Sequence, residues 1–121
     1  MRKLSDREWM VLGELWESGG MTLSELTAAL YEKIGWNRNT VLTYLTRMEA
    51  KGVVTIDKEG YPRCYRAALS QEDCRAQARD SFLRQVYQGS TGDLVAAFLK
   101  AQPISAQERD ELRRLLDDME V

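Results

Sequence analysis

Apolar side chains in the segment from Trp36 to Gly52 recur with the period of an α-helix. They fall at the spacing i, i+3, i+4 and i+7 and so share one stripe, formed by Val41, Tyr44, Leu45 and Met48. The opposite side is small, polar or cationic except at Leu42; it consists of Asn39, Leu42, Thr43, Thr46 and Arg47. Asn37 is suited to cap the first turn, and Gly52 can take the left-handed conformation that ends a helix. The segment predicts a helix with one packed side and one side suited to hydrogen bonding.

Two helical patterns precede this segment, and each opens with a capping box. The sequences at 5–8 (Ser-Asp-Arg-Glu) and 22–25 (Thr-Leu-Ser-Glu) have the spacing at which a cap residue and the third helical residue bond to each other's backbone. Gly19–Gly20 ends the first pattern, and Gly35 ends the second about two residues before the cap at Asn37. Two helices joined by a short glycine-containing turn are typical of a helix-turn-helix, in which the second helix reads DNA.

After Gly52 the pattern changes from helical to short and β-branched. Residues 53–56 (Val-Val-Thr-Ile) predict a strand, residues 57–62 have turn composition, and residues 63–69 can return as a second strand. A helix-turn-helix followed by a hairpin is the layout of a winged helix. The wing would lie along the phosphates with Lys58 and Arg63 at its tip, while the preceding helix enters the major groove.

Three more helices are expected in the C-terminal part. One begins near Ser70 and runs to about Gln88, a short one stops before Pro103, and a third opens with a capping box at 105–108. Their apolar faces are wide, but the helices are too few and short to bury enough surface alone. We therefore interpret this part as a dimerisation region covered by a second copy, with contacts from Phe82, Val86, Leu94, Phe98, Leu112, Leu115 and Leu116.

The predicted fold class is mostly α with a small β-hairpin. A winged helix-turn-helix DNA-binding domain would occupy residues 1–70, and a helical dimerisation region would occupy residues 71–121. The net charge of −2 is divided along the chain in the same way. Residues 36–66 hold six Lys/Arg against three Asp/Glu, whereas residues 71–121 hold seven against ten. A basic segment joined to an acidic one favours one part that contacts a polyanion and another that does not.

Composition excludes several kinds of function. The chain has no histidine, so a Ser-His-Asp or Cys-His catalytic arrangement is impossible. Its only cysteines, Cys64 and Cys74, are too few for a usual zinc site. No apolar stretch approaches the roughly 20 residues needed to cross a bilayer, and the N-terminus lacks the apolar core of a signal peptide. We expect a soluble cytoplasmic protein that is not an enzyme, has no cofactor or metal, and does not bind membranes.

Double-stranded DNA is the partner that these patterns favour. Arg can bond guanine through two hydrogen bonds, Asn can bond adenine, and Thr can serve base edges or phosphates. The candidates for groove contacts are Asn39, Leu42, Thr43, Thr46 and Arg47. The candidates for phosphate contacts beside them are Arg38, Thr40 and Lys51. The candidates from the wing are Lys58, Tyr61 and Arg63.

These candidates also have a plainer interpretation, in which the helix side is merely a solvated face and the wing candidates are simple solvated turn residues. Leu42 is as consistent with an isolated exposed leucine as with a contact to a thymine methyl. Trp9, Trp16 and Trp36 fit core anchors better than stacking platforms. The two cysteines fit small hydrophobic residues better than redox or metal groups. The alternative function is a winged-helix protein-interaction module that uses the same helix as a docking face without sequence-specific DNA binding.

The chain resembles the penicillinase-repressor family, the BlaI/MecI-type winged-helix transcriptional repressors, and their copper-responsive relatives. The resemblance extends over essentially the whole chain. The matching positions are Leu4-Ser5, Glu8-Trp9, Leu15-Trp16, Trp36, Thr40-Val41, Thr43, Leu45, Arg47, Lys51-Gly52, Ser81-Phe82-Leu83 and Glu111-Leu112-Arg113. The resemblance implies a homodimer that binds a palindromic operator and represses transcription, with regulation often directed at β-lactam resistance or metal homeostasis.

The sequence departs from this family pattern in two places. The resemblance implies a regulatory protease that cuts an Asn-Phe bond in the short C-terminal helix, and the matching pair here is Ala97-Phe98. Copper-responsive members carry a cysteine-rich metal motif at the C-terminus, whereas residues 113–121 contain no cysteine. The inducing signal, the operator sequence and the target genes are therefore not given by the resemblance.

Overall fold

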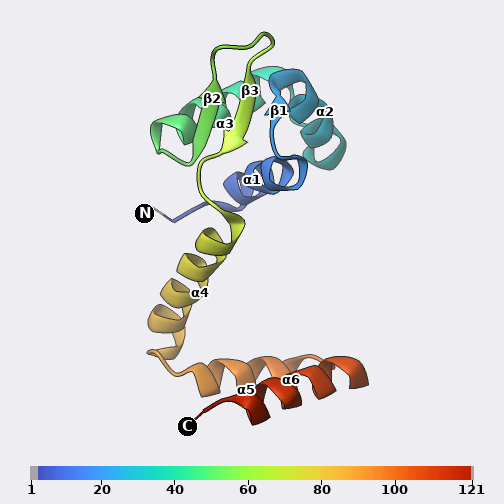
Figure 1. Ribbon diagram of the computed structural model, residues 1–121, viewed down its shortest axis with the longest axis vertical. Coiled ribbons are helices and arrows are strands. Elements are labelled where there is room, and N and C mark those ends of the chain that lie inside the picture. The colour runs from blue at the N-terminus through green and yellow to red at the C-terminus, as the bar shows by residue number, and fades with distance from the viewer. Residues whose placement is uncertain (1–2, 121) are drawn as a thin grey trace. The chain divides into compact units, whose positions relative to one another are not determined.

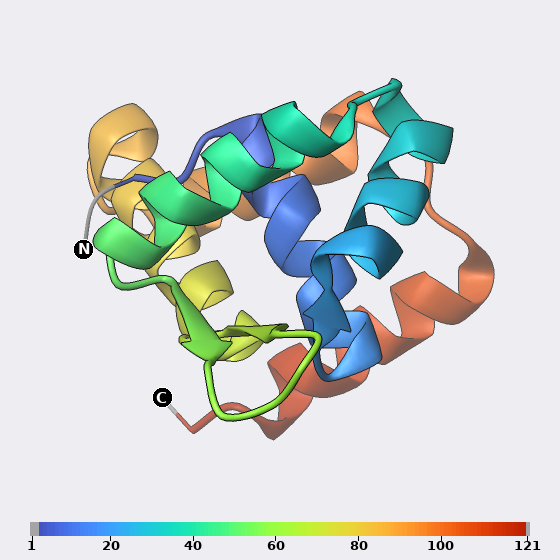
Figure 2. The ribbon, with the colours of Figure 1, turned by 90° about the horizontal axis from the view of Figure 1, so that it is seen from above.

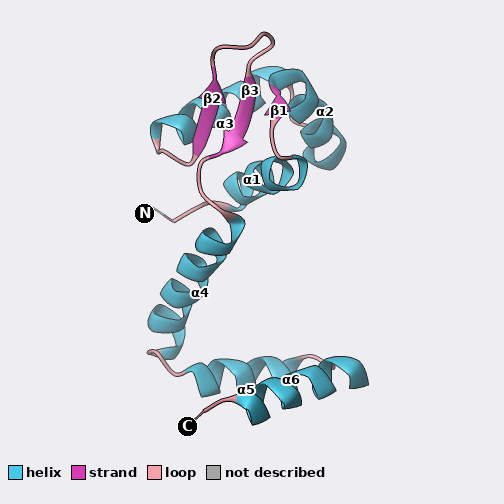
Figure 3. Cartoon of the chain, in the orientation of Figure 1, coloured by secondary structure: helices cyan, strands magenta, loops and turns pink. Residues whose placement is uncertain are grey.

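The computed structural model describes residues 3–120. Residues 1, 2 and 121, which fall at the outer ends of the two expected domains, lie outside the described residues. Figures 1 and 3 show the order of the elements along the chain. The elements are α1 (Asp6–Ser18), β1 (Met21–Thr22), α2 (Leu23–Ile34), α3 (Arg38–Ala50), β2 (Val54–Asp57), β3 (Cys64–Ala67), α4 (Gln71–Tyr87), α5 (Thr91–Ala101) and α6 (Ala106–Asp118). The predicted fold class, mostly helical with a small β component and a winged helix-turn-helix, is confirmed.

The described chain forms two compact units that divide after Ala78. The division falls within α4, so the first turns of this helix belong to the first unit and the remainder to the second. The charge balance and the pattern predict the boundary eight residues earlier, at residue 70. In the described part of either unit, no helix is both long enough and apolar enough to cross a membrane.

The helices begin and end where the local sequence predicts. The Ser5 hydroxyl accepts the backbone N–H of Glu8 at 3.2 Å, and the Glu8 carboxylate accepts the N–H of Ser5 at 2.9 Å. The same reciprocal pair of bonds opens α2 at Thr22 and α6 at Ser105. Gly35 ends α2 with φ of +71°, a left-handed conformation that a residue with a Cβ adopts only at a steric cost.

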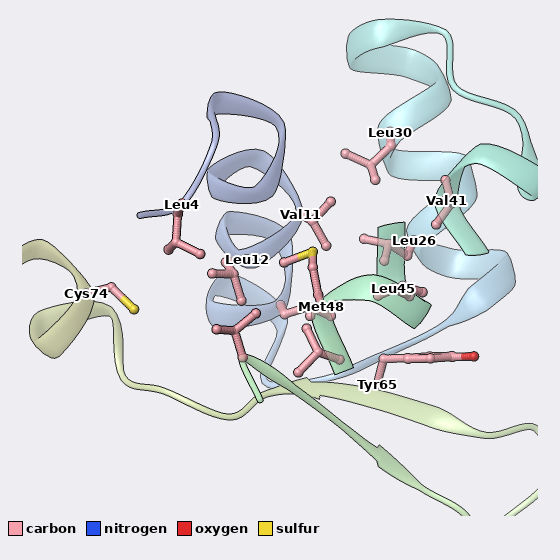
Figure 4. Close-up of a cluster of buried hydrophobic side chains, with 13 residues drawn as sticks. Leu4, Val11, Leu12, Leu26, Leu30, Val41, Leu45, Met48, Tyr65 and Cys74 are labelled. Carbon is pink, nitrogen blue, oxygen red and sulfur yellow. The ribbon is translucent and has the colours of Figure 1, made fainter. Parts of the chain in front are cut away.

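The core of the first unit is built from one stripe of each of its first three helices and from the sheet (Figure 4). Three residues from α1, two from α2 and three from α3 are 0–1% exposed: Val11, Leu12, Leu15, Leu26, Leu30, Val41, Leu45 and Met48. Burying a side chain of this size stabilises a fold by about 1.5–3 kcal/mol. The core therefore fixes α3 by its apolar stripe and leaves the other side of that helix free.

The sheet has one strand more than the predicted hairpin. Its order is β1-β3-β2, and all neighbours are antiparallel, with Met21 opposite Tyr65 and Val54 opposite Ala67. A two-residue strand such as β1 has no period of its own, which is why the sequence does not reveal it. The first predicted strand begins one residue later than expected, at Val54, because the N–H of Val53 bonds to the carbonyl of Met48 at 3.0 Å in the turn that follows α3.

The second unit leaves its apolar side chains largely uncovered. Within residues 79–120, no side chain is fully buried. The exposed large apolar residues of this unit are Phe82, Val86, Val95, Phe98, Leu99, Ile104, Leu112, Leu115, Leu116 and Met119. This matches the expectation that these helices cannot cover their own apolar faces.

Candidate nucleic-acid interface

The α3 helix has one buried side and one exposed side. Its residues Val41, Leu45 and Met48 are completely buried in the core. The exposed residues on the other side, which we call the recognition face, are Asn39, Leu42, Thr43, Thr46 and Arg47. Leu42 is 41% exposed, so it is not drawn into the core. The structure thus gathers all five sequence-predicted groove candidates on one exposed face.

The start of α3 is held by contacts with neighbouring elements. The Asn37 side-chain oxygen accepts the backbone N–H of Thr40 at 3.0 Å, which confirms Asn37 as the cap. The ring of Trp36 lies 4.3 Å from that of Tyr44, measured between centroids, so this tryptophan packs against the helix that it precedes. The Arg38 guanidinium donates to the Ser24 hydroxyl of α2 at 3.1 Å. Arg38 remains exposed, next to the first turn of α2.

The two threonines of the recognition face are bonded within their own helix. The Thr43 hydroxyl donates to the carbonyl of Asn39 at 2.9 Å, and the Thr46 hydroxyl donates to the carbonyl of Leu42 at 2.8 Å. A hydroxyl has one proton and two acceptor lone pairs, so each threonine keeps acceptor capacity toward solvent. The exposed guanidinium of Arg47 and amide of Asn39 add donor groups to the same face.

The hairpin loop provides a second exposed polar surface. We call residues 58–63 the wing loop; it joins β2 to β3 directly after the last pair of the ladder, Asp57 opposite Cys64. Figure 2 shows this loop projecting from the sheet. Lys58, Tyr61 and Arg63 are all exposed, and Tyr61 is 99% exposed. The wing loop therefore presents two cations and one aromatic ring to solvent.

Lys51 differs from the other candidates. Its ammonium donates to the Glu8 carboxylate at 2.7 Å, and the two side chains are only 23% and 10% exposed. Burial alone would raise the pKa of Glu8, but the hydrogen bond and charge of Lys51 and the hydrogen bonds from Ser5 outweigh it, so the pKa of this carboxyl lies below its ordinary value of 4.5. The local sequence indicates Glu8 as part of a capping box but gives no signal of its second partner, which lies 43 residues away.

The remaining reactive groups of the described chain form no evident chemical site. Residues 3–120 contain no cluster of three or more His, Cys, Asp or Glu arranged to hold a metal ion. Both cysteines are free thiols. Cys74 is buried in the core, where burial raises the pKa of its thiol and the charge of Asp73 raises it further. Trp16 donates from its indole nitrogen to the carbonyl of Leu69 at 2.9 Å, as expected of a structural anchor.

Comparison with known proteins gives full-length matches. The chain is similar to the penicillinase repressor of Bacillus licheniformis, with 28% identity over 96% of this chain and 91% of that protein. It is also similar to the methicillin resistance regulatory protein MecI of Staphylococcus aureus (strain N315), with 24% identity over 95% of this chain and 94% of that protein. Among solved structures, the PcaV transcriptional regulator of Streptomyces coelicolor aligns with 98% of this chain and 79% of its own, at 20% identity and a TM-score of 0.46.

A family model decides the assignment. The model described as penicillinase repressor matches residues 4–118, which include every element from α1 to α6. The residues quoted for the resemblance lie in the same span, from Leu4 to Arg113. The chain therefore belongs to the penicillinase repressor family.

Proposed function

We propose that this protein is a transcriptional repressor that binds a palindromic DNA operator as a homodimer. The observation that carries the proposal is the recognition face, an exposed polar and cationic side of α3 whose opposite side is completely buried. A helix held in this way can enter the major groove without unfolding any of the core, because that groove admits an α-helix. Membership of the penicillinase repressor family supports the same function.

The side chains of α3 and of the wing loop divide into groups suited to bases and groups suited to phosphates. Arg47 and Asn39 carry the donors that recognise guanine and adenine edges, and Thr43 and Thr46 add acceptors. Arg38 and Thr40 at the start of α3 and the cations of the wing loop are suited to phosphates, which set orientation without reading sequence. Leu42 is the one apolar side chain on the face and fits a thymine methyl.

The homodimer is supported by the second unit. Phe98 is 58% exposed, Leu115 66% and Leu116 65%, so the described chain leaves most of these three residues of α5 and α6 uncovered. Apolar surface left in water is unfavourable by about 25 cal/mol per Å², so a partner that covers it gains free energy. A second copy offers the same apolar surface, and a two-fold dimer would present two recognition helices to an inverted repeat.

The proposal is tested by measuring DNA affinity as a function of salt. Duplexes that bind the full-length protein are first selected from a random pool, and the dissociation constant is then measured from low to moderate salt. We expect inverted-repeat sequences and a steep fall in affinity, since each neutralised phosphate contributes about 0.9 to the slope of log K against log salt. A protein that enriches no sequence, or whose affinity is independent of salt, would instead support the protein-interaction alternative.

A further inference from the structure

The ion pair between Glu8 and Lys51 joins the start of α1 to the end of α3. The two residues are 43 positions apart in the sequence, and the Lys51 Nζ lies 2.7 Å from the Glu8 Oε2. Glu8 is only 8% exposed. The other carboxylate oxygen of Glu8 accepts the N–H of Ser5 at 2.9 Å, so the orientation of the carboxylate is fixed by the capping box. Because α1 is itself anchored by three fully buried residues, Lys51 is bonded to a rigid support.

The backbone of Lys51 is also fixed to α3 by hydrogen bonds. Lys51 is the C-cap residue directly after Ala50, and its backbone N–H donates to the carbonyls of Arg47 and Glu49. Two residues later, just before the sheet begins at Val54, Val53 is 2% exposed and its N–H bonds to the carbonyl of Met48. The Lys51 side chain therefore bonds to Glu8 of α1, while its backbone bonds to the last turn of α3, which carries Arg47.

We propose that Glu8 and Lys51 are positioning residues that fix the C-terminal end of α3, and with it Arg47, so that this pair sets operator specificity while Lys51 contacts no phosphate. The inference rests on the proposed function. Its physical reason is that a base contact needs its donor placed to a fraction of an ångström, whereas a phosphate contact tolerates displacement. Lys51 would have to break a largely buried ion pair to reach DNA, which leaves a carboxylate without its partner.

The test compares Lys51→Gln, Glu8→Gln and the double variant in the full-length protein. For each one, affinity is measured for the selected operator and for a random duplex, over a series of salt concentrations. Lys33→Gln is the matched control, because Lys33 also pairs with a glutamate of α1, Glu14, but lies on α2 outside the recognition face. Lys51→Arg is the conservative variant, since arginine keeps the charge and can still bond to Glu8.

We expect Lys51→Gln and Glu8→Gln to lower operator affinity more than random-duplex affinity, and the double variant to lose no more than either one alone. The salt slope should stay at the value of the unmutated protein, Lys51→Arg should restore the operator preference, and Lys33→Gln should change neither quantity. A loss of stability alone would lower both affinities together and leave their ratio unchanged, so the ratio separates positioning from folding.

The opposite pattern would overturn the inference. If Lys51 binds a phosphate, Lys51→Gln weakens both duplexes alike and lowers the salt slope by about 0.9, and Glu8→Gln tightens binding by freeing the ammonium. Amide hydrogen exchange of the last turn of α3 tests the same inference without DNA. Protection that falls in both single variants supports the positioning role of Glu8 and Lys51, and unchanged protection contradicts it. A protein that binds no duplex at all would contradict the proposed function, and the exchange measurement would still decide the structural role of the pair.

Discussion

The Glu8 carboxylate connects the start of α1 to the end of α3. One oxygen completes the capping box of α1, and the other holds Lys51 at the end of α3. These interactions are stronger with the ionised form, and they lower the pKa of Glu8 in spite of its burial. The group is thus a stabilising feature that is sensitive to acid.

Replacing Glu8 with glutamine should therefore cost stability in a manner that depends on pH. A carboxyl whose pKa is lower in the folded state contributes stability above its unfolded value, here close to 4.5, and loses it as the pH falls through the folded value. We expect Glu8→Gln to lower the free energy of unfolding by about 1–3 kcal/mol near neutral pH, the range for a hydrogen bond to a charged group. The difference from the unmutated protein should shrink in acid. Urea unfolding at neutral pH and below pH 4 measures it, and a constant difference would contradict the assignment.

Arg47 is the residue of the recognition face best suited to reading a base. If its guanidinium bonds guanine through two hydrogen bonds, Arg47→Ala should cost about 1–3 kcal/mol on the operator and less on a random duplex. Lys58→Ala in the wing loop is the comparison, since loss of a phosphate contact should weaken both duplexes equally. Equal losses on the two duplexes for Arg47→Ala would assign this arginine to phosphate as well.

At the scale of the secondary-structure elements, α5 contains the bond that the family resemblance connects with regulation. Ala97 is half-buried and Phe98 is exposed, and the carbonyl of Phe98 accepts the N–H of Gln102 at 3.1 Å near the end of the helix. A protease that recognises Asn before Phe would find alanine at this position. A protease pocket built to hydrogen-bond an amide leaves its own polar groups unpaired against an apolar side chain.

We therefore predict that a β-lactam-sensing protease of the Asn-Phe type cuts the unmutated protein poorly and cuts Ala97→Asn faster, by a factor on the order of 10⁴ if the pocket bonds the amide fully. Ala96→Asn serves as the control, because it adds the same amide one residue earlier. Incubation of the purified proteins with such a protease, followed by mass spectrometry, measures the rates. Rapid cleavage between Ala97 and Phe98 in the unmutated protein would show that alanine is accepted.

At the scale of the whole molecule, DNA affinity should depend on the second unit even though this unit carries no proposed DNA contact. Replacing Leu112 and Leu116 with aspartate places charges on the exposed apolar side of α6 and should give monomers. Operator affinity should then fall by about 10²–10⁴-fold, since the second half-site is no longer bound at high effective concentration. Arg113→Asp, on the same helix, is the control. Sedimentation measures the state of association, and a monomer at micromolar concentration before mutation would contradict the homodimer.

Local features were predictable from the sequence, and contacts between distant segments were not. The caps at Ser5, Thr22, Asn37 and Ser105 depend on residues within one turn, so pattern alone placed the helix starts. The recognition face followed from the same period. In contrast, β1 exists only because Met21 lies opposite Tyr65, and the Glu8–Lys51 pair exists only because the fold brings α1 to the end of α3. Neither leaves a local signal, and the prediction of a phosphate contact for Lys51 rests on its charge and on its place beside the recognition face.

If Thr43 and Thr46 contact operator bases as proposed, their internal hydrogen bonds affect which bases they match. Each hydroxyl proton is already given to a carbonyl of α3, so only lone pairs face outward. In the major groove adenine and cytosine present exocyclic amino groups, which are donors, whereas the carbonyls of guanine and thymine are acceptors. Wherever these hydroxyls meet a base edge, an amino-bearing base matches and a carbonyl leaves two acceptors facing each other. As long as these internal bonds are kept, they favour adenine or cytosine over guanine or thymine at any position that either hydroxyl contacts.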